Sequence, residues 1–131
     1  MIVLDTSAAL ELLLSLPLAG KVQQHLDVAD WQIAAPQLLI VEVLQVLRRR
    51  TAAGLTSTDD ANEALELLRD LNIHYFDHDL LADRVWELRE NLTAYDASYV
   101  ALAEMLNADL ITADAKMASA PGNRAGILLI E

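Results

Sequence analysis

The chain has 131 residues, 54% of them hydrophobic and 22% charged, so it is long and apolar enough to form one domain, over residues 1–131, with its own core. It contains no cysteine, which excludes disulfide bonds, thiolate zinc sites and cysteine nucleophiles. Nine Lys and Arg against twenty Asp and Glu give a net charge of -11, so overall attraction to phosphate cannot hold a nucleic acid, and any polyanion would need a local basic patch or bound cations.

The apolar start of the chain does not predict a secretory signal, because it lacks a basic segment and contains Asp5 and Glu11. The next apolar run, residues 38–47, is too short to span a bilayer. We therefore expect a soluble, cytoplasmic protein without a membrane partner.

Short apolar runs alternate with helical periodicity along the whole chain. We predict strands at residues 2–4, 32–35, 73–76, 110–112 and 126–130. The first predicted helix follows a cap at Thr6 or Ser7 and ends at residue 14, with Pro17 and Gly20 as stops. A helix that follows a cap at 57–60 is predicted to end at residue 71. The other predicted helices cover residues 21–27, 37–53, 79–90, 97–106 and 114–118. This alternation predicts an α/β fold in which helices cover both faces of a parallel sheet.

Four acidic residues occupy positions where burial or convergence is expected. Glu42 has Leu38, Leu39 and Val46 as helical neighbours and no Lys or Arg within a turn, although it could also reach solvent from the edge of an apolar stripe. The other three lie at a strand end or a helix start, where they could simply be N-caps: Asp5, Asp96 and Asp114. Carboxyl ends of parallel strands converge, and clustered carboxylates need a hard cation such as Mg²⁺ or Mn²⁺. That combination predicts metal-assisted hydrolysis of a phosphate ester.

Four blocks in the chain, in this order, resemble the PIN-domain ribonucleases, most closely the VapC-type toxins of bacterial toxin–antitoxin pairs: MIVLDTSAAL, LLIVEVLQVLRRR, LTAYDASYVALAE and LITADAKMA. The resemblance implies a three-layer α/β/α sandwich with a central, mainly parallel sheet. It also implies a Mg²⁺- or Mn²⁺-dependent endoribonuclease that cleaves structured RNA of the tRNA or rRNA class and is neutralised by a cognate antitoxin. We also expect a homodimer.

The resemblance also assigns roles to residues. The catalytic and metal-binding acids would be Asp5, Glu42, Asp96 and Asp114. The supporting hydroxyls would be those of Thr6 or Ser7 and Thr112. Some relatives carry a further acid where this chain has Lys116 and Met117, which leaves open whether one metal or two are bound.

Other candidate residues have ordinary alternatives. Arg48, Arg49 and Arg50 either complement a helix dipole or, like Lys116, contact RNA or antitoxin. Tyr95 and Tyr99, which flank Asp96, are expected to pack but could stack on a base.

Two further segments have ordinary interpretations. The cluster of His and Asp at residues 74–79 is expected to be structural, with Asp79 as a cap. The leucines of residues 8–18 belong to the core, a dimer face or an antitoxin groove.

The alternative to a nuclease is a catalytically inert PIN-like module used for binding or dimerisation. A phosphate-receiver domain is disfavoured, because Thr6 rather than a second Asp follows Asp5.

Overall fold

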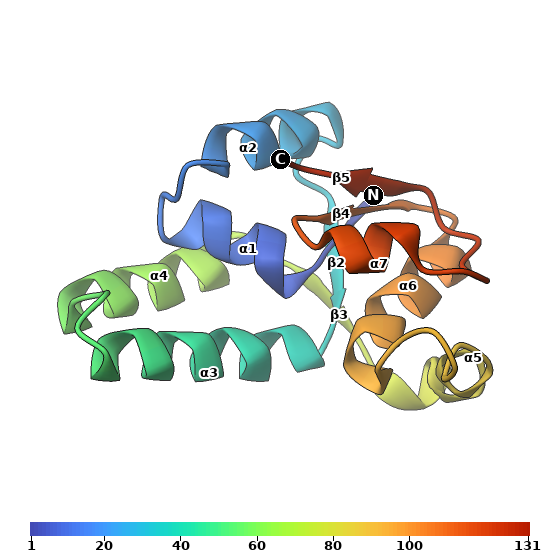
Figure 1. Ribbon diagram of the computed structural model, residues 1–131. Helices are drawn as coiled ribbons and strands as arrows, with labels where there is room; N and C mark the ends of the chain where they lie inside the picture. Colours follow the sequence, from blue (N-terminus) through green and yellow to red (C-terminus); the bar gives the residue numbers. More distant parts are fainter.

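The computed structural model describes all residues 1–131, and its centre is a five-stranded parallel sheet in the order β3-β2-β1-β4-β5 (Figure 1). The strands are β1 (Ile2–Leu4), β2 (Ile33–Pro36), β3 (His74–Phe76), β4 (Asp109–Thr112) and β5 (Ile127–Leu129). The helices are α1 (Thr6–Leu13), α2 (Ala19–Val28), α3 (Leu38–Ala52), α4 (Thr58–Asp70), α5 (Ala82–Glu87), α6 (Ala94–Leu106) and α7 (Ala115–Ser119). A 3₁₀ turn over His78–Leu80 precedes α5.

Two layers of helices enclose the sheet. Figure 1 shows α1 to α4 on one side of the strands and α5 to α7 on the other, so the predicted three-layer α/β/α architecture is confirmed. The chain builds the sheet outward from β1 to β3, crosses back and adds β4 and β5 on the other side of β1. The strand order therefore reverses between β1 and β4, and open α/β sheets bind ligands at the carboxyl ends of strands at such a reversal.

The core explains why the central strands are apolar along their whole length. Val3 and Leu4 are fully buried in β1, and they lie between β2 and β4 with Val3 opposite Ala34 and Leu110. Helix α6 packs against β1 and β2 and is buried over all of residues 97–103. Alanines at 97, 101 and 103 keep this buried stretch slim enough to lie close to the sheet. None of the helices is long and apolar enough to cross a bilayer.

Several predicted boundaries are wrong, for local reasons. Helix α1 is capped by Asp5, whose carboxylate accepts a hydrogen bond from the Ala8 amide, and not by Thr6 or Ser7. Gly20 lies inside α2, whereas it was predicted as a stop. Strand β2 includes Pro36, since the amide of the next residue, Gln37, completes the pairing with β3.

Two helices also begin elsewhere than predicted. The helix predicted over 79–90 is a 3₁₀ turn followed by the shorter α5. Helix α6 begins at Ala94 after a cap by Thr93, so Asp96 lies within its first turn and does not precede it.

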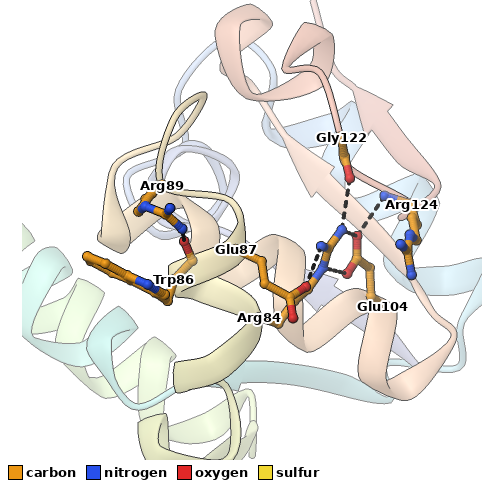
Figure 2. A network of polar contacts seen from close by, with 7 residues as sticks. All are labelled: Arg84, Trp86, Glu87, Arg89, Glu104, Gly122 and Arg124. Atoms are coloured by element: carbon orange, nitrogen blue, oxygen red, sulfur yellow. Dashed lines mark hydrogen bonds and ion pairs between the residues drawn. The ribbon is translucent and has the colours of Figure 1, made fainter.

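An arginine–glutamate pair ties the second helical layer to the segment that leads into β5 (Figure 2). Arg84 of α5 donates to both carboxylate oxygens of Glu104 in α6, at 2.7 and 3.2 Å, and to the carbonyl oxygen of Gly122 at 2.8 Å. The amide of Arg124 donates to the same carboxylate at 2.6 Å. Figure 2 also shows Trp86 pointing away from this network, with the Arg89 guanidinium 4.5 Å from its ring centroid.

We expect Glu104→Gln to lower the free energy of unfolding by roughly 1.5–3 kcal/mol, because hydrogen bonds to a charged group are lost. Burial works to raise the pKa of Glu104, but the Arg84 and Arg124 contacts outweigh it, and the pKa is lowered. The stabilisation is therefore present at neutral pH and is lost as the pH falls through the lowered pKa of the folded state. Urea unfolding at pH 7 and pH 3 measures both effects. Glu87→Gln, which removes an exposed partner of Arg84, is the control and should cost under about 0.5 kcal/mol.

Candidate functional site

The four acids predicted from the sequence lie where the strand order reverses. Asp5 follows β1 and Asp114 follows β4, and each is the N-cap of the next helix. Asp96 lies in the first turn of α6, and Glu42 lies in the second turn of α3. Figure 1 shows the N-terminal ends of these four helices, α1, α3, α6 and α7, gathered around the ends of β1 and β4. The positive ends of the helix dipoles partly offset the repulsion among the acids.

Asp5 is the most buried acid of the site, with 3% of its surface exposed. Its Oδ1 accepts hydrogen bonds from the Ala8 amide at 2.9 Å and from the Ser7 hydroxyl at 2.7 Å, and its Oδ2 accepts one from the Thr112 hydroxyl at 2.5 Å. A carboxylate oxygen has two lone pairs, so these bonds saturate Oδ1 and leave one lone pair on Oδ2.

The same hydroxyls attach the β4–α7 junction to Asp5. Ser7 Oγ accepts a hydrogen bond from the Ala113 amide, and Thr112 Oγ1 accepts one from the Asp114 amide, both at 2.9 Å. Each hydroxyl therefore accepts from the backbone of this junction while it donates to the Asp5 carboxylate. The backbone position of Asp114 is thereby fixed relative to Asp5. The structure places the hydroxyls of Ser7 and Thr112 against the Asp5 carboxylate, and their role as supporting groups stays a prediction.

Glu42 is held by two hydroxyls from other elements. Thr6 Oγ1 lies 2.7 Å and the Tyr99 hydroxyl 2.5 Å from Glu42 Oε1, and the two hydroxyl oxygens are 2.8 Å apart. Tyr99 is only 1% exposed, so it cannot stack on a base. The prediction that Tyr99 packs in the interior is therefore confirmed. Tyr95 is 62% exposed beside Asp96 and stays available for such a contact.

Charge repulsion between acids of the site raises the pKa values of Asp96 and Asp5. Burial raises the pKa of Asp96, and the neighbouring charges of Asp114 and Glu42 raise it further. Burial raises the pKa of Asp5 to about 6 against the three hydrogen bonds, and the charge of Asp96 adds to this effect. The buried phenol of Tyr99 also has a raised pKa, mainly through burial and the Glu42 carboxylate, so it keeps its proton.

The donor chemistry of this site fits a hard divalent cation. The acids offer only oxygen ligands, they repel one another, and Asp5 keeps a free lone pair, which together suit Mg²⁺ or Mn²⁺. No three of the acidic or histidine side chains lie close enough together to hold a metal ion by themselves, so the structure does not bring the four acids into one complete ligand set. Such an ion would therefore keep water molecules in its coordination shell, as Mg²⁺ usually does in proteins.

The remaining basic candidates lie at different distances from the acids along their helices. Lys116 is exposed on α7, and its amide donates to the Asp114 carboxylate at 2.9 Å. Arg48 and Arg49 are exposed at the far end of α3 from the acid site. Arg50 is half-buried and donates to the Thr56 hydroxyl at 2.9 Å, so it has a structural partner.

Two members of the cluster at residues 74–79 form structural contacts, and the predicted cap at Asp79 is wrong. His78 Nε2 accepts a hydrogen bond from the Leu38 amide at 3.0 Å, so it satisfies the start of α3. Asp77 accepts one from the Gln37 side chain at 2.9 Å. Asp79, which was predicted as a cap, lies inside the 3₁₀ turn.

Sequence reasoning missed the polar role of Tyr99. Its neighbours Ala97, Val100 and Ala101 indicate a buried helix face, and this is correct. The only available signal was that a tyrosine, with its hydroxyl to satisfy, occupies a position where phenylalanine would pack equally well.

We expect the metal-free protein to lose stability as the pH rises through about 6, because Asp5 must then ionise in a buried position. A raised pKa means that the folded state binds the proton more tightly than the unfolded state, so the free energy of unfolding is higher below pH 6. Between pH 5 and pH 8 the parent should lose roughly 1 kcal/mol more than Asp5→Asn. Urea unfolding in EDTA measures this difference, and the exposed control Asp79→Asn should follow the parent. Parallel pH profiles for the parent and Asp5→Asn would contradict the prediction.

Comparison with known proteins identifies the family. The model of the PIN domain matches residues 2–123. The chain is 41% identical over 117 residues to VapC ribonuclease Mb0985 of Mycobacterium bovis, and the matched residues cover 89% of this chain and 88% of that protein. It is 34% identical over 130 residues to Ribonuclease VapC12 of Mycobacterium tuberculosis, with 99% of both chains covered.

Solved structures show the same fold. The crystal structure of VapBC2 from Rickettsia felis, bound to a DNA fragment from its promoter, matches with a TM-score of 0.75 at 15% identity over the full length of both chains. The crystal structure of PAE2754 from Pyrobaculum aerophilum matches with a TM-score of 0.69 at 22% identity, over 96% of this chain and 81% of that one. The chain therefore belongs to the PIN-domain family and, within it, to the VapC type.

Proposed function

We propose that this protein is a Mg²⁺- or Mn²⁺-dependent endoribonuclease toxin that is neutralised by a cognate antitoxin. The observation that carries the proposal is the placement of four acids around the strand-order reversal, where Asp5 is buried and the charges of Asp114 and Glu42 raise the pKa of Asp96. A protein that places these charges together without a cation would lose stability for no gain. The name ribonuclease, which the curated relatives carry at 34–41% identity, supports the same activity.

The residues would divide the work as their positions allow. Asp5, Asp96 and Asp114 would hold the metal, directly or through water, and Glu42 would hold a metal water or orient the attacking one. When bound, such an ion lowers the pKa of a water and stabilises charge on a phosphoryl oxygen. Attack by water rather than by the ribose 2′-hydroxyl leaves a 5′-phosphate and a 3′-hydroxyl, and it needs no histidine.

The substrate we propose is structured RNA of the tRNA or rRNA class, cleaved in loops where unstacked bases can enter a site. With a net charge of -11 the protein cannot attract RNA as a whole, so local cations must guide the backbone. Lys116, next to Asp114, is our candidate at the site, and the exposed Arg48 and Arg49 are candidates for a more distant contact.

The antitoxin would bind a groove beside α1 and α4. This cavity of about 660 Å³ is lined by 12 residues, 5 of which are hydrophobic, among them Leu13, Leu16 and Leu67. Its other lining residues include the acids Asp60, Glu63, Glu66 and Asp70. A mixed lining of leucines and acids is complementary to a basic amphipathic segment, which is the chemistry that we propose for the antitoxin here.

We expect the purified protein to cleave RNA with Mn²⁺ or Mg²⁺ and to stop when EDTA is added. Asp5→Asn and Asp96→Asn should each lose nearly all cleavage, because a neutral amide cannot balance the charge of the metal. Gel analysis with end-labelled RNA measures the rate and identifies a 5′-phosphate product. The exposed Asp79→Asn, made and purified in the same way, should keep the parent's rate. Undiminished cleavage by Asp5→Asn, in preparations free of contaminating nuclease, would contradict the catalytic role of Asp5, and a parent that cleaves no RNA with either metal would favour an inert binding module.

Thermal melts with EDTA and with Mn²⁺ test the metal site separately from catalysis. In EDTA, Asp114→Asn should be as stable as the parent or more so, because Asn caps a helix nearly as well and the charge next to Asp96 is removed. Mn²⁺ should stabilise the parent by about 2.7 kcal/mol at a hundredfold excess over its dissociation constant, and Asp114→Asn by less. Asp79→Asn should respond like the parent. An equal Mn²⁺ shift in Asp114→Asn would remove Asp114 from the metal site.

A further inference from the structure

The hydroxyl of Tyr99 lies in a closed set of three oxygen atoms that come from three helices. Tyr99 of α6 contacts Glu42 of α3 at 2.5 Å and Thr6 of α1 at 2.8 Å, and Thr6 contacts Glu42 at 2.7 Å. Tyr99 is also the largest of the fully buried side chains. The contact therefore joins α1 and α3, which lie in one helical layer, to α6 in the other.

Packing alone does not account for this hydroxyl. A buried hydroxyl costs free energy unless it forms hydrogen bonds, and phenylalanine would fill the same apolar space without that requirement. The partners of the Tyr99 hydroxyl are Glu42 and Thr6, both of which lie at the site. The Tyr99 hydroxyl therefore has a role that concerns the position of the Glu42 side chain.

Both hydroxyls contact the same oxygen of the Glu42 side chain. Oε1 receives Thr6 and Tyr99, so the lone pairs of Oε2 stay available. Glu42 is half-buried at the edge of α3, beside the 63% exposed Val41, and a long side chain there is otherwise free to turn toward solvent. Repulsion from Asp96 would favour that movement, because the two charges act on each other. The hydroxyls oppose it.

We propose that Tyr99, together with Thr6, is a positioning residue that holds Glu42 by Oε1 and keeps Oε2 turned toward Asp96 and the other acids of the site. This inference rests on the proposed function, since it gives Glu42 its place beside the metal. Tyr99 itself touches neither substrate nor metal.

The experiment compares Tyr99→Phe, which removes one oxygen atom, with the parent. Outer-shell partners of metal sites typically contribute 10–100-fold to metal affinity or activity, so Mn²⁺ should bind Tyr99→Phe about tenfold more weakly or worse. Titration calorimetry, or Mn²⁺ paramagnetic resonance, measures this affinity without RNA. At saturating Mn²⁺ the kcat for RNA should also fall while KM is unchanged. Tyr75→Phe, the same change in β3 away from the site, is the control and should behave like the parent.

A double-mutant cycle separates positioning from general stability. If Tyr99 acts through Glu42, Tyr99→Phe should have no further effect on Mn²⁺ affinity in a Glu42→Gln background. Thr6→Val, which removes the second hydroxyl that contacts Glu42, serves as the second test if Tyr99→Phe fails to fold. Parent-like Mn²⁺ affinity in the folded variants, or equal losses in both backgrounds, overturns the positioning role and leaves the proposed function intact. A parent that binds Mn²⁺ but cleaves no RNA overturns the proposed function alone, and a parent that binds no Mn²⁺ overturns both.

Discussion

The buried carboxylate of Asp5 is the constraint on which the rest of the site depends. An unpaired charge at the end of the central strand would be costly, so the protein surrounds it with a helix amide and two hydroxyls. Those donors come from both sides of the strand-order reversal, and the backbone amides of 113 and 114 in turn hold the hydroxyls. The contacts that make Asp5 tolerable thus also determine where α1 and the β4–α7 junction lie. Stability and site geometry rest on one set of hydrogen bonds.

Much of the architecture could be predicted because buried parallel strands are short apolar runs, and helices between them leave periodic patterns. The placement of Asp5 and Asp114 at strand ends follows from that alternation alone. The cap of α1 could not be predicted, since Asp5, Thr6 and Ser7 are all good cap residues. The choice among them depends on two distant residues. Glu42, 36 residues along the chain, contacts Thr6, and Thr112, 107 residues along the chain, contacts Asp5.

The role of each acid is harder to predict than its position. Tyr99 contacts Glu42 across 57 residues of sequence, and the helix pattern around it indicates only burial. The small residues of α6 predict a buried helix face. They also keep α6 close to β1 and β2, which allows the phenol of Tyr99 to reach α3. The catalytic and metal-binding assignments of the four acids stay predictions, because no contact in the protein distinguishes a ligand from a neighbour of a ligand.

The strand order has a consequence for the time at which the protein matures during its own synthesis. Strand β4 lies next to β1, although nearly the whole chain separates them in sequence, and Thr112 is one of the donors that Asp5 requires. A growing chain that still lacks β4 has an incomplete sheet, an unsatisfied Asp5 and no Asp114. Such long-range pairing must wait for the distant segment to become available. A chain with this topology cannot complete the surroundings of Asp5 until β4 and Thr112 have been translated, so the site forms only near the end of synthesis.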